Sequence, residues 1–484
     1  MDPANLAILV NGWQLPGAGV ALPADHNLQP RGALMYRQTR HVPAAWQWFP
    51  AARYGLFIHW GAYAAYGRGE QVLFREHLDQ SDYGRAACQW NPEHYDARAW
   101  ADVARRAGMR YAVLTARHHD GFCLWDSRHT DYTVGSQAPG RDFVREFLTA
   151  FRAAGLRVGL YYSLADWRIP AYWEGPNHDP VGWEEFRVYV HQQVTELLRD
   201  YGHLDVFWFD GAWPQNALEW GGPELVARMR SLQPHLLINN RLGSIPAPAS
   251  AHADGGSGPG TSSLGDFGTP EHHIAAESER LWESCQVSTW RLWGYAAGEH
   301  WRSSAQWLDM LVQAASMGGN LLLNVGPDGD GRLPPQFVER AVEVGDWLRV
   351  HGEAIYEAEG GDVCEMITRG YQTVRGHTLY LVLRFWDGRP ELRLAGLATP
   401  VRRARLLTTG QELQVAQEGD QVRVSGLPAA APTRLFPVIK LECDGPPAPA
   451  AWARERLWGG DPRRMTAWAQ ARGTSVWADG LPRR

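Results

Sequence analysis

Polar and ionisable side chains recur at the carboxyl ends of successive predicted strands in this chain of 484 residues. The carboxyl ends of parallel barrel strands meet on one face, which is where barrel enzymes build their active sites. Five such endings indicate a polar pocket with aromatic walls. In chain order they are His59-Trp60-Gly61, Arg117-His118-His119-Asp120-Gly121-Phe122, Tyr161-Tyr162-Ser163, Asp210-Gly211 and Asn240-Arg241.

Asp210 is the first candidate for covalent or acid–base chemistry, because it directly follows the apolar and aromatic run LDVFWF. A carboxylate at the end of a buried strand is held rigidly and is partly desolvated, as a nucleophile or general base requires. An aspartate after a strand also commonly caps the next helix. This segment alone is compatible with both roles.

The adjacent histidines His118 and His119 could bind either a metal or a sugar. Neighbouring side chains on a strand or tight turn point in different directions, and no HExxH motif or further His/Cys spacing completes a metal site. Neutral imidazoles that donate to and accept from sugar hydroxyls fit the pattern better, while structural hydrogen bonding remains open. This spacing therefore predicts no metal site, and no organic cofactor is expected.

The elements that must position these residues alternate between short apolar runs and helical patterns over residues 50–350. One helical pattern covers Ala97–Gly108, with apolar residues at helical spacing and a closing glycine. Alternation of this kind predicts parallel βα units that close into a (β/α)8-like barrel. A doubly wound open sheet is the alternative, although no GxGxxG motif opens a helix after an early strand. The predicted strands are Gly55–His59, Tyr111–Thr115, Leu156–Ser163, Leu204–Asp210, Leu236–Asn239 and Asn320–Val325.

The pattern changes near residue 358 to short β-rich runs separated by turn signals, which predicts a C-terminal antiparallel β-sandwich. The runs are Thr378–Phe385, Glu391–Leu394, Val422–Val424 and Val438–Glu442. We therefore divide the chain into an N-terminal segment (1–44), an α/β catalytic barrel (45–357), the sandwich (358–446) and an Arg/Trp-rich tail of unknown role (447–484). The Gly/Ser/Pro-rich stretch Ile245–Ser263 is interpreted as an active-site lid or as a flexible insertion.

Composition excludes several classes of protein. The formal net charge is −6, from 47 basic and 53 acidic residues, whereas a general nucleic-acid binder needs a basic surplus. The five cysteines are scattered without CxxC spacing, which argues against a disulfide framework. No apolar run approaches the ~18 residues of a membrane span, and no signal peptide is recognised at the N-terminus. We therefore expect a cytoplasmic protein that binds neither nucleic acid nor membranes.

Several motifs, in a consistent order, resemble those of the α-L-fucosidases of glycoside hydrolase family 29. The resemblance covers about residues 45–357, and the β-rich segment that follows fits the C-terminal sandwich of that family. The motifs are YGLFIHWGAY (54–63), RYAVLTARHHDGFCLWDS (110–127), GLRVGLYYSLADW (155–167), DVFWFDGAW (205–213), GDFGTPEHHI (265–274), WESC (282–285), WGY (293–295) and GGNLLLNVGPDGDG (318–331).

The resemblance implies a retaining exo-α-L-fucosidase that removes terminal α-linked L-fucose through a covalent fucosyl-enzyme intermediate. Asp210 matches the nucleophile of the family. Glu271 is the best match for the acid/base, and Glu283 of WESC is the second candidate. The sugar-binding positions carry over as His59, Glu70, His118, His119, Tyr161, Trp208, Arg241 and Trp293.

Two departures from the family pattern concern substrate contacts. The acidic-Trp pair near the first strand appears here as Glu70-Gln71, which removes an aromatic wall and affects the expected aglycone preference. The family's KHHDGF appears with Arg117 in place of lysine, a change that conserves only the charge.

The expected partner is a fucosylated glycan or a small α-L-fucoside, and a homo-oligomer remains open. The competing interpretations are a glycosidase of another specificity on the same barrel, a non-catalytic sugar-binding protein and a metal-dependent isomerase. Product stereochemistry would distinguish an inverting glycosidase, a missing carboxylate would favour the binding protein, and loss of activity with chelator would favour the isomerase.

Overall fold

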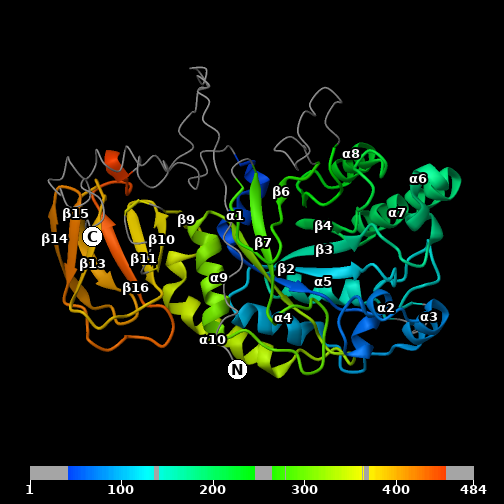
Figure 1. Ribbon diagram of the computed structural model, residues 1–484, viewed down its shortest axis with the longest axis horizontal. Helices are drawn as coiled ribbons and strands as arrows, with labels where there is room; N and C mark the ends of the chain where they lie inside the picture. The colour runs from blue at the N-terminus through cyan, green and yellow to red at the C-terminus, as the bar shows by residue number, and fades with distance from the viewer. Residues whose placement is uncertain are drawn as a thin grey trace, which may run out of the picture.

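Eight parallel strands form the first sheet and follow one another around it in chain order (Figure 1). This computed structural model describes residues 42–135, 141–245, 264–277, 280–361, 363–364 and 370–453. Strand β1 pairs with both β2 and β8, so the sheet curves into a nearly closed barrel and confirms the predicted (β/α)8-like fold. The strands are β1 (Tyr54–Ile58), β2 (Tyr111–Arg117), β3 (Arg157–Ser163), β4 (Val206–Asp210), β5 (Leu237–Ile238), β6 (Phe267–Gly268), β7 (Leu281–Val287) and β8 (Asn320–Val325).

The junction of β5 and β6, here called the seam, is the shortest part of the barrel wall. Each of its two strands has only two residues, and a single bridge between Asn239 and Phe267 joins them. Asp266 supports the junction, because its backbone N–H donates to the Ile238 carbonyl at 2.7 Å and its carboxylate accepts from the Ile238 N–H at 2.8 Å. The barrel therefore closes through few backbone contacts at this point.

Helices pack against the outside of the barrel, where their apolar faces and the outward-facing strand residues form the largest buried cluster. The predicted helix over Ala97–Gly108 is present as α4, and α9 begins with a capping box formed by Ser303 and Gln306. Among the described residues no α-helix lies between β5 and β6 or between β6 and β7. The helices are α1 (Trp48–Ala52), α2 (Val72–Arg75), α3 (Gln80–Gln89), α4 (Ala97–Arg106), α5 (Phe143–Ala153), α6 (Pro170–His178), α7 (Pro180–Asp200), α8 (Gly222–Leu232), α9 (Ser304–Ser316) and α10 (Pro335–His351).

Alternate residues of each strand point into the barrel, because side chains on a strand have a period of two. On β4 the inward residues are Val206, Trp208 and Asp210, and the first two belong to a separate apolar cluster that fills the interior. On β7 the inward positions include Glu283 and Cys285, and Cys285 belongs to the same cluster. The alternation of side chains that buries Trp208 inside the barrel thus also points Asp210 into its mouth.

Eight antiparallel strands form the second sheet, in the order β12-β15-β14-β13-β16-β11-β10-β9. They enclose their own apolar core, which confirms the predicted sandwich. The predicted strands at 378, 391, 422 and 438 correspond to β11, β12, β15 and β16. The bounds are β9 (Glu359–Gly360), β10 (Gly370–Arg375), β11 (Thr378–Leu383), β12 (Glu391–Ala395), β13 (Val401–Leu406), β14 (Glu412–Glu418), β15 (Gln421–Ser425) and β16 (Val438–Cys443).

The second sheet lies beside α9 and α10, at the left of the barrel in Figure 1. The Trp347 indole of α10 donates to the Phe436 carbonyl at 2.8 Å, and Lys440 of β16 pairs with Glu353 at 2.8 Å. The first strand of this sheet begins at Glu359, and the exact domain limits stay a prediction. Most of the predicted N-terminal segment (1–44), tail (447–484) and loop Ile245–Ser263 lies outside the described residues.

Candidate active site

A pocket of about 130 Å³ opens at the carboxyl ends of the barrel strands. It is smaller than the ~300–1,000 Å³ of typical drug-sized sites, and this size suits a single sugar ring. Nine of the ten predicted catalytic and substrate-binding residues line it together: His59, His118, His119, Tyr161, Trp208, Asp210, Arg241, Glu271 and Trp293. Only Glu70 of the predicted set lies outside the lining.

Asp210, the last residue of β4, presents its carboxylate to the pocket. The Tyr161 hydroxyl at the neighbouring position of β3 donates to Oδ2 at 2.9 Å. Arg241 Nη1 approaches Oδ1 at 3.4 Å, and His119 Nε2 lies 3.8 Å from Oδ2. A carboxylate oriented by a hydroxyl and a guanidinium is held in one position, as a nucleophile requires.

Arg241 joins Asp210 to Glu271, because the same Nη1 donates to Glu271 Oε2 at 2.8 Å. Thr269 holds the other side of the guanidinium, accepting from Nε at its hydroxyl (2.9 Å) and from Nη2 at its carbonyl (3.0 Å). The guanidinium also lies over the Trp208 ring, 4.7 Å from its centroid. One rigid cation therefore sets the spacing of the two carboxylates.

Three buried histidines line the same side of the pocket. Burial lowers the pKa of His59 to about 3, and it also lowers the pKa of His118 and of His119 below the ordinary imidazole value. The rings are therefore neutral, and each can both donate and accept one hydrogen bond. His118 Nδ1 has no partner in the part of the chain that the structure describes. Within those residues no group of three or more His, Cys, Asp or Glu side chains is arranged to hold a metal ion.

The hydrogen-bond network behind His119 determines which of its nitrogens carries the proton. His119 Nδ1 lies 2.7 Å from Ser163 Oγ, which itself donates to the Ala165 carbonyl at 3.0 Å. Because a serine hydroxyl has one hydrogen, it must accept from His119 Nδ1. His119 Nε2 therefore offers a lone pair to the pocket, next to Asp210. An asparagine at the end of β8 does the same for His59, since Asn324 Oδ1 accepts from His59 Nδ1 at 2.7 Å.

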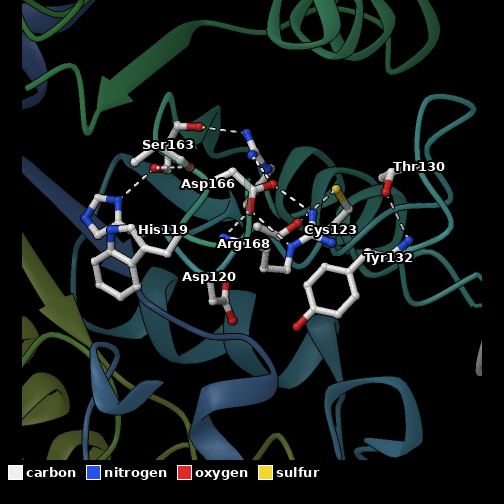
Figure 2. Close-up of polar contacts among 12 residues, drawn as sticks. His119, Asp120, Cys123, Thr130, Tyr132, Ser163, Asp166 and Arg168 are labelled. Atoms are coloured by element: carbon white, nitrogen blue, oxygen red, sulfur yellow. Dashed lines mark hydrogen bonds and ion pairs between the residues drawn. The ribbon is translucent and has the colours of Figure 1, made fainter. Parts of the chain in front are cut away.

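Figure 2 shows the polar cluster that supports this wall, with Asp166 beside Arg168 and close to Ser163. Asp166 accepts from Arg117 and from Arg168, each at 2.7 Å, and all three side chains lie behind the pocket rather than in its lining. Although burial by itself raises a carboxyl pKa, the two guanidinium groups hold the pKa of Asp166 below its usual range. Arg117 also donates to the Ser163 carbonyl at 3.0 Å, so it supports the pocket from behind through β3 as well as through the segment that carries His118 and His119.

Trp293 lines the pocket beside His59, and Glu70 lies behind it, outside the lining. Glu70 Oε2 accepts from the backbone N–H groups of Trp293 and Gly294 at 3.1 and 2.8 Å, so its carboxylate is directed at that loop. The Trp293 ring packs on His59, with centroids 5.0 Å apart. A side chain at Gly294 would collide with the Glu70 backbone, so the close approach requires glycine. Glu70 therefore orients Trp293 in this structure, and the direct sugar contact predicted for Glu70 stays a prediction.

Glu283 lies below the pocket and does not line it. Its carboxyl group is fully buried, accepting from the Tyr111 hydroxyl at 2.5 Å and from the Trp208 indole at 3.0 Å. Glu271 is different, since its side chain keeps 35% exposure and faces the mouth of the pocket. His272, which follows it, has a φ of 59° and places its ring 5.1 Å from Trp293. Of the two glutamates, only Glu271 is within reach of a ligand in the pocket.

Comparison with known proteins bears on what this pocket does. A sequence model of the family described as "Alpha-L-fucosidase" matches residues 33–353, which is well over half of the chain. The chain belongs to the α-L-fucosidases of glycoside hydrolase family 29. It is a glycoside hydrolase.

Solved fucosidases share this fold. Alpha-L-fucosidase isoenzyme 1 from Paenibacillus thiaminolyticus is 36% identical with a TM-score of 0.73, covering 83% of this chain and 99% of its own. A trapped covalent intermediate of an α-L-fucosidase from Bacteroides thetaiotaomicron, in complex with 2-fluoro-fucosyl fluoride, is 28% identical with a TM-score of 0.74 and covers 84% and 97%. Among curated proteins, tissue alpha-L-fucosidase of Bos taurus is 29% identical over 83% of this chain and 89% of its own length.

Four residues of this fucosidase pocket were not predicted from the sequence: Phe57, Gln71, Trp213 and Cys285. Phe57 lies two residues before His59, and Cys285 lies two residues after Glu283. Because side chains alternate along a strand, both therefore point into the barrel, and the sequence could have identified them. Trp213 lies three residues after Asp210. It is 55% exposed, which is unusual for tryptophan, and this exposure is known only from the structure.

Proposed function

We propose that this chain is a retaining exo-α-L-fucosidase that hydrolyses terminal α-linked L-fucose by double displacement. One observation carries the proposal: Arg241 Nη1 contacts both Asp210 Oδ1 (3.4 Å) and Glu271 Oε2 (2.8 Å). Because both distances start from the same nitrogen, the Asp210 and Glu271 oxygens can lie no farther apart than the sum of the two distances. That limit is below the ~6.5 Å at which inverting pairs begin, and it is compatible with the ~5–5.5 Å of retaining pairs.

In the first step, an Asp210 oxygen attacks the anomeric carbon of fucose, and the bond from that carbon to the leaving oxygen breaks. Glu271 gives its proton to that oxygen, which departs as the free aglycone. In the second step, water attacks the same carbon, Glu271 takes up the water proton, and the bond to Asp210 breaks. Two inversions leave the fucose with its original configuration.

The pocket also accounts for recognition of the sugar. His59 and His119, whose Nδ1 protons are used behind the pocket, each offer an Nε2 lone pair that accepts from a ring hydroxyl, and neutral His118 can also donate. Phe57 lies 5.1 Å from Trp208 and 5.9 Å from Trp293, centroid to centroid, and these rings form an apolar surface for the C5 methyl group of fucose. The small volume of the pocket supports removal of one terminal residue at a time.

The stereochemistry of the product tests the proposal. Proton NMR should detect α-L-fucose as the first product released from 4-nitrophenyl α-L-fucoside, before mutarotation adds the β anomer. Early β-L-fucose would show inversion and would contradict the double displacement. An Asp210→Asn variant, treated identically, controls for a contaminating fucosidase.

Selectivity among sugars tests the fucose assignment separately. Turnover of 4-nitrophenyl α-L-fucoside should greatly exceed that of the β-D-galactoside, and a chelator should change neither rate. A preference for the galactoside would indicate a glycosidase of another specificity on this barrel.

A further inference from the structure

Glu271 and His272 are neighbours in the chain, and their side chains lie side by side at the mouth of the pocket. His272 Nε2 lies 3.5 Å from Glu271 Oε1. Successive side chains of an extended segment point in opposite directions, so this arrangement requires a turn of the backbone. The turn is made at His272, whose φ of 59° lies in the left-handed region. The backbone thus brings an imidazole to the carboxyl group that the proposed mechanism uses as acid and base.

The left-handed conformation of His272 is unfavourable for a residue with a side chain, so the surrounding structure must hold it. The His272 backbone N–H donates to the Cys285 carbonyl of β7 at 3.2 Å, and the Cys285 N–H donates to the Pro270 carbonyl at 3.1 Å. These bonds pair Glu271 with Cys285 as an isolated parallel bridge. Strained residues of this kind cluster at functional sites, and here the strain places one particular side chain beside Glu271.

The Glu271 carboxyl group has a different neighbour at each oxygen. Arg241 Nη1 donates to Oε2 at 2.8 Å, whereas His272 faces Oε1. A carboxyl group held at one oxygen can still rotate about the bond to its side chain, and a contact at the second oxygen prevents that rotation. The His272 ring is itself held, because it packs on Trp293 with centroids 5.1 Å apart. Catalytic hydrogen bonds are often long in the free enzyme and shorten in the complex with substrate, so 3.5 Å is within reach.

The charge of the His272 ring suits this position. Burial lowers the pKa of the imidazole, which is therefore neutral near pH 7. Among the charged and titratable groups that face it, Glu271 opposes this shift and the others favour it: Arg302, Arg241 and His273. A neutral ring can donate from Nε2 to Oε1 without adding a second cation to Arg241. A second cation would favour an ionised carboxylate over the protonated form that a general acid needs.

We propose that His272 is a positioning residue for the acid/base: by donating from Nε2 to Glu271 Oε1, it leaves Oε2 to carry the proton. Oε2 is the oxygen that shares Arg241 Nη1 with Asp210, so it lies on the side of the nucleophile. In the first step the proton of Oε2 passes to the leaving oxygen, and in the second step Oε2 takes up a proton from water. His272 keeps its own proton throughout. The inference rests on the proposed function and deepens it by one residue.

The test measures kcat/KM on phenyl α-L-fucoside and divides it by kcat/KM on 4-nitrophenyl α-L-fucoside. Phenol is the poorer leaving group, so this ratio falls when the acid is misplaced. His272→Gly removes the ring and suits the left-handed backbone, so it should lower the ratio by about tenfold without lowering the melting temperature. The matched control is His77→Gly, because His77 after α2 is exposed and also left-handed, with a φ of 50°. It should keep the parent ratio.

Two further variants show whether the ring acts through Glu271. His272→Gln retains an N–H donor on a side chain of similar reach, so it should keep more of the ratio than His272→Gly. In a Glu271→Ala background, His272→Gly should lower the ratio no further, because the group that it positions is absent.

An unchanged ratio in His272→Gly, or an equal fall in both backgrounds, would show that the inference is wrong. Support of Trp293 alone would give the first of these results, since both fucosides would then lose activity equally. If the parent cleaves neither fucoside, the proposed function fails instead.

Discussion

The indole N–H of Trp208 donates to the carboxyl group of Glu283 at 3.0 Å, one inward position below the catalytic pocket. Trp208 in turn stacks on Tyr161, whose hydroxyl binds Asp210. Glu283 therefore has no direct contact with Asp210 and is linked to it through Trp208 and Tyr161, and we regard it as a positioning residue. Because Glu283 is buried, its protonation should affect the free energy of unfolding.

Stability should depend on pH through Glu283. Burial raises its pKa from about 4.5 to about 7, although hydrogen bonds from Tyr111 and Trp208 oppose the shift. The unfolded chain releases this proton above about pH 4.5, whereas the folded chain keeps it until about pH 7. The stabilisation is complete below pH 4.5 and is lost as the pH rises to 7. Relative to the parent, Glu283→Gln should gain up to about 3 kcal/mol across that window.

Urea unfolding at pH 5 and pH 8 measures this difference. The control is Glu339→Gln, a surface carboxyl on α10, which should follow the parent at both values. A constant offset between Glu283→Gln and the parent would mean that Glu283 is ionised throughout.

Asp210→Gly should lose most fucosidase activity and keep the fold, since a carboxylate at the rim of the barrel adds little to core packing. Added azide should partly restore turnover by entering the vacated space, and the product should be β-linked fucosyl azide. Product analysis by NMR and mass spectrometry checks both points. Asp102→Ala, an exposed carboxylate on α4, should behave as the parent, and unimpaired kinetics of Asp210→Gly would refute the assignment.

Glu271→Ala should lose far more activity on natural fucosides than on a nitrophenyl fucoside, because an activated phenol departs with little protonation. General acid catalysis contributes ~10²–10⁴-fold, which sets the expected gap. Glu283→Ala serves as the comparison and should lose similar activity on both substrates. If the dependence on the leaving group appears in Glu283→Ala instead, the two roles must be exchanged.

Much of the barrel could be predicted because its buried strands read as apolar runs. Six of the eight strands were expected from the sequence. The other two lack that signal: β6 has only two residues, and β7 (LWESCQV) contains Glu283, Ser284 and Gln286 among its apolar residues. Each is buried with hydrogen-bond partners, for example Ser284 Oγ donating to the His273 carbonyl. Hydrogen bonds to residues elsewhere in the fold offset the cost of burying these polar side chains. Those partners cannot be identified from the local sequence pattern.

Two strands of the second sheet also lack an apolar pattern that would identify them from the sequence. Strands β13 (VRRARL) and β14 (ELQVAQE) were not predicted, because they are rich in charged and polar residues on the exposed face. Their pairing buries Ala404 and Leu413. A strand with so few apolar residues is recognisable only beside its partner.

The site residues were predicted as a set, but their mutual arrangement was not. Strand ends and family motifs identified Asp210, Arg241 and Glu271 without indicating that one guanidinium nitrogen contacts both carboxylates. The direction of Glu70 toward the Trp293 backbone depends equally on a loop more than 200 residues away, which spacing along the chain does not encode.

Trp293→Ala should weaken fucose binding while the chemistry of the carboxylates continues. Burial of a methyl group is worth ~1 kcal/mol, and stacking on the ring adds to it, so the Ki for fucose should rise by at least about fivefold. The matched control is Trp290→Ala, three residues earlier, which is exposed and outside the pocket lining. Equal inhibition constants for Trp293→Ala and the parent would make this tryptophan a packing residue.

The seam between β5 and β6 makes catalysis more fragile than the fold. Asp210 lies on β4, before the seam, while Thr269 and Glu271 follow β6, beyond it, and Arg241 spans the gap from the end of β5. A small loosening there would separate nucleophile from acid while the remaining six strands stay paired. On warming, activity should therefore fall before the near-ultraviolet dichroism of the tryptophans changes, and coincident transitions would contradict this. The working geometry of the enzyme depends on the part of its wall that has the fewest backbone bonds.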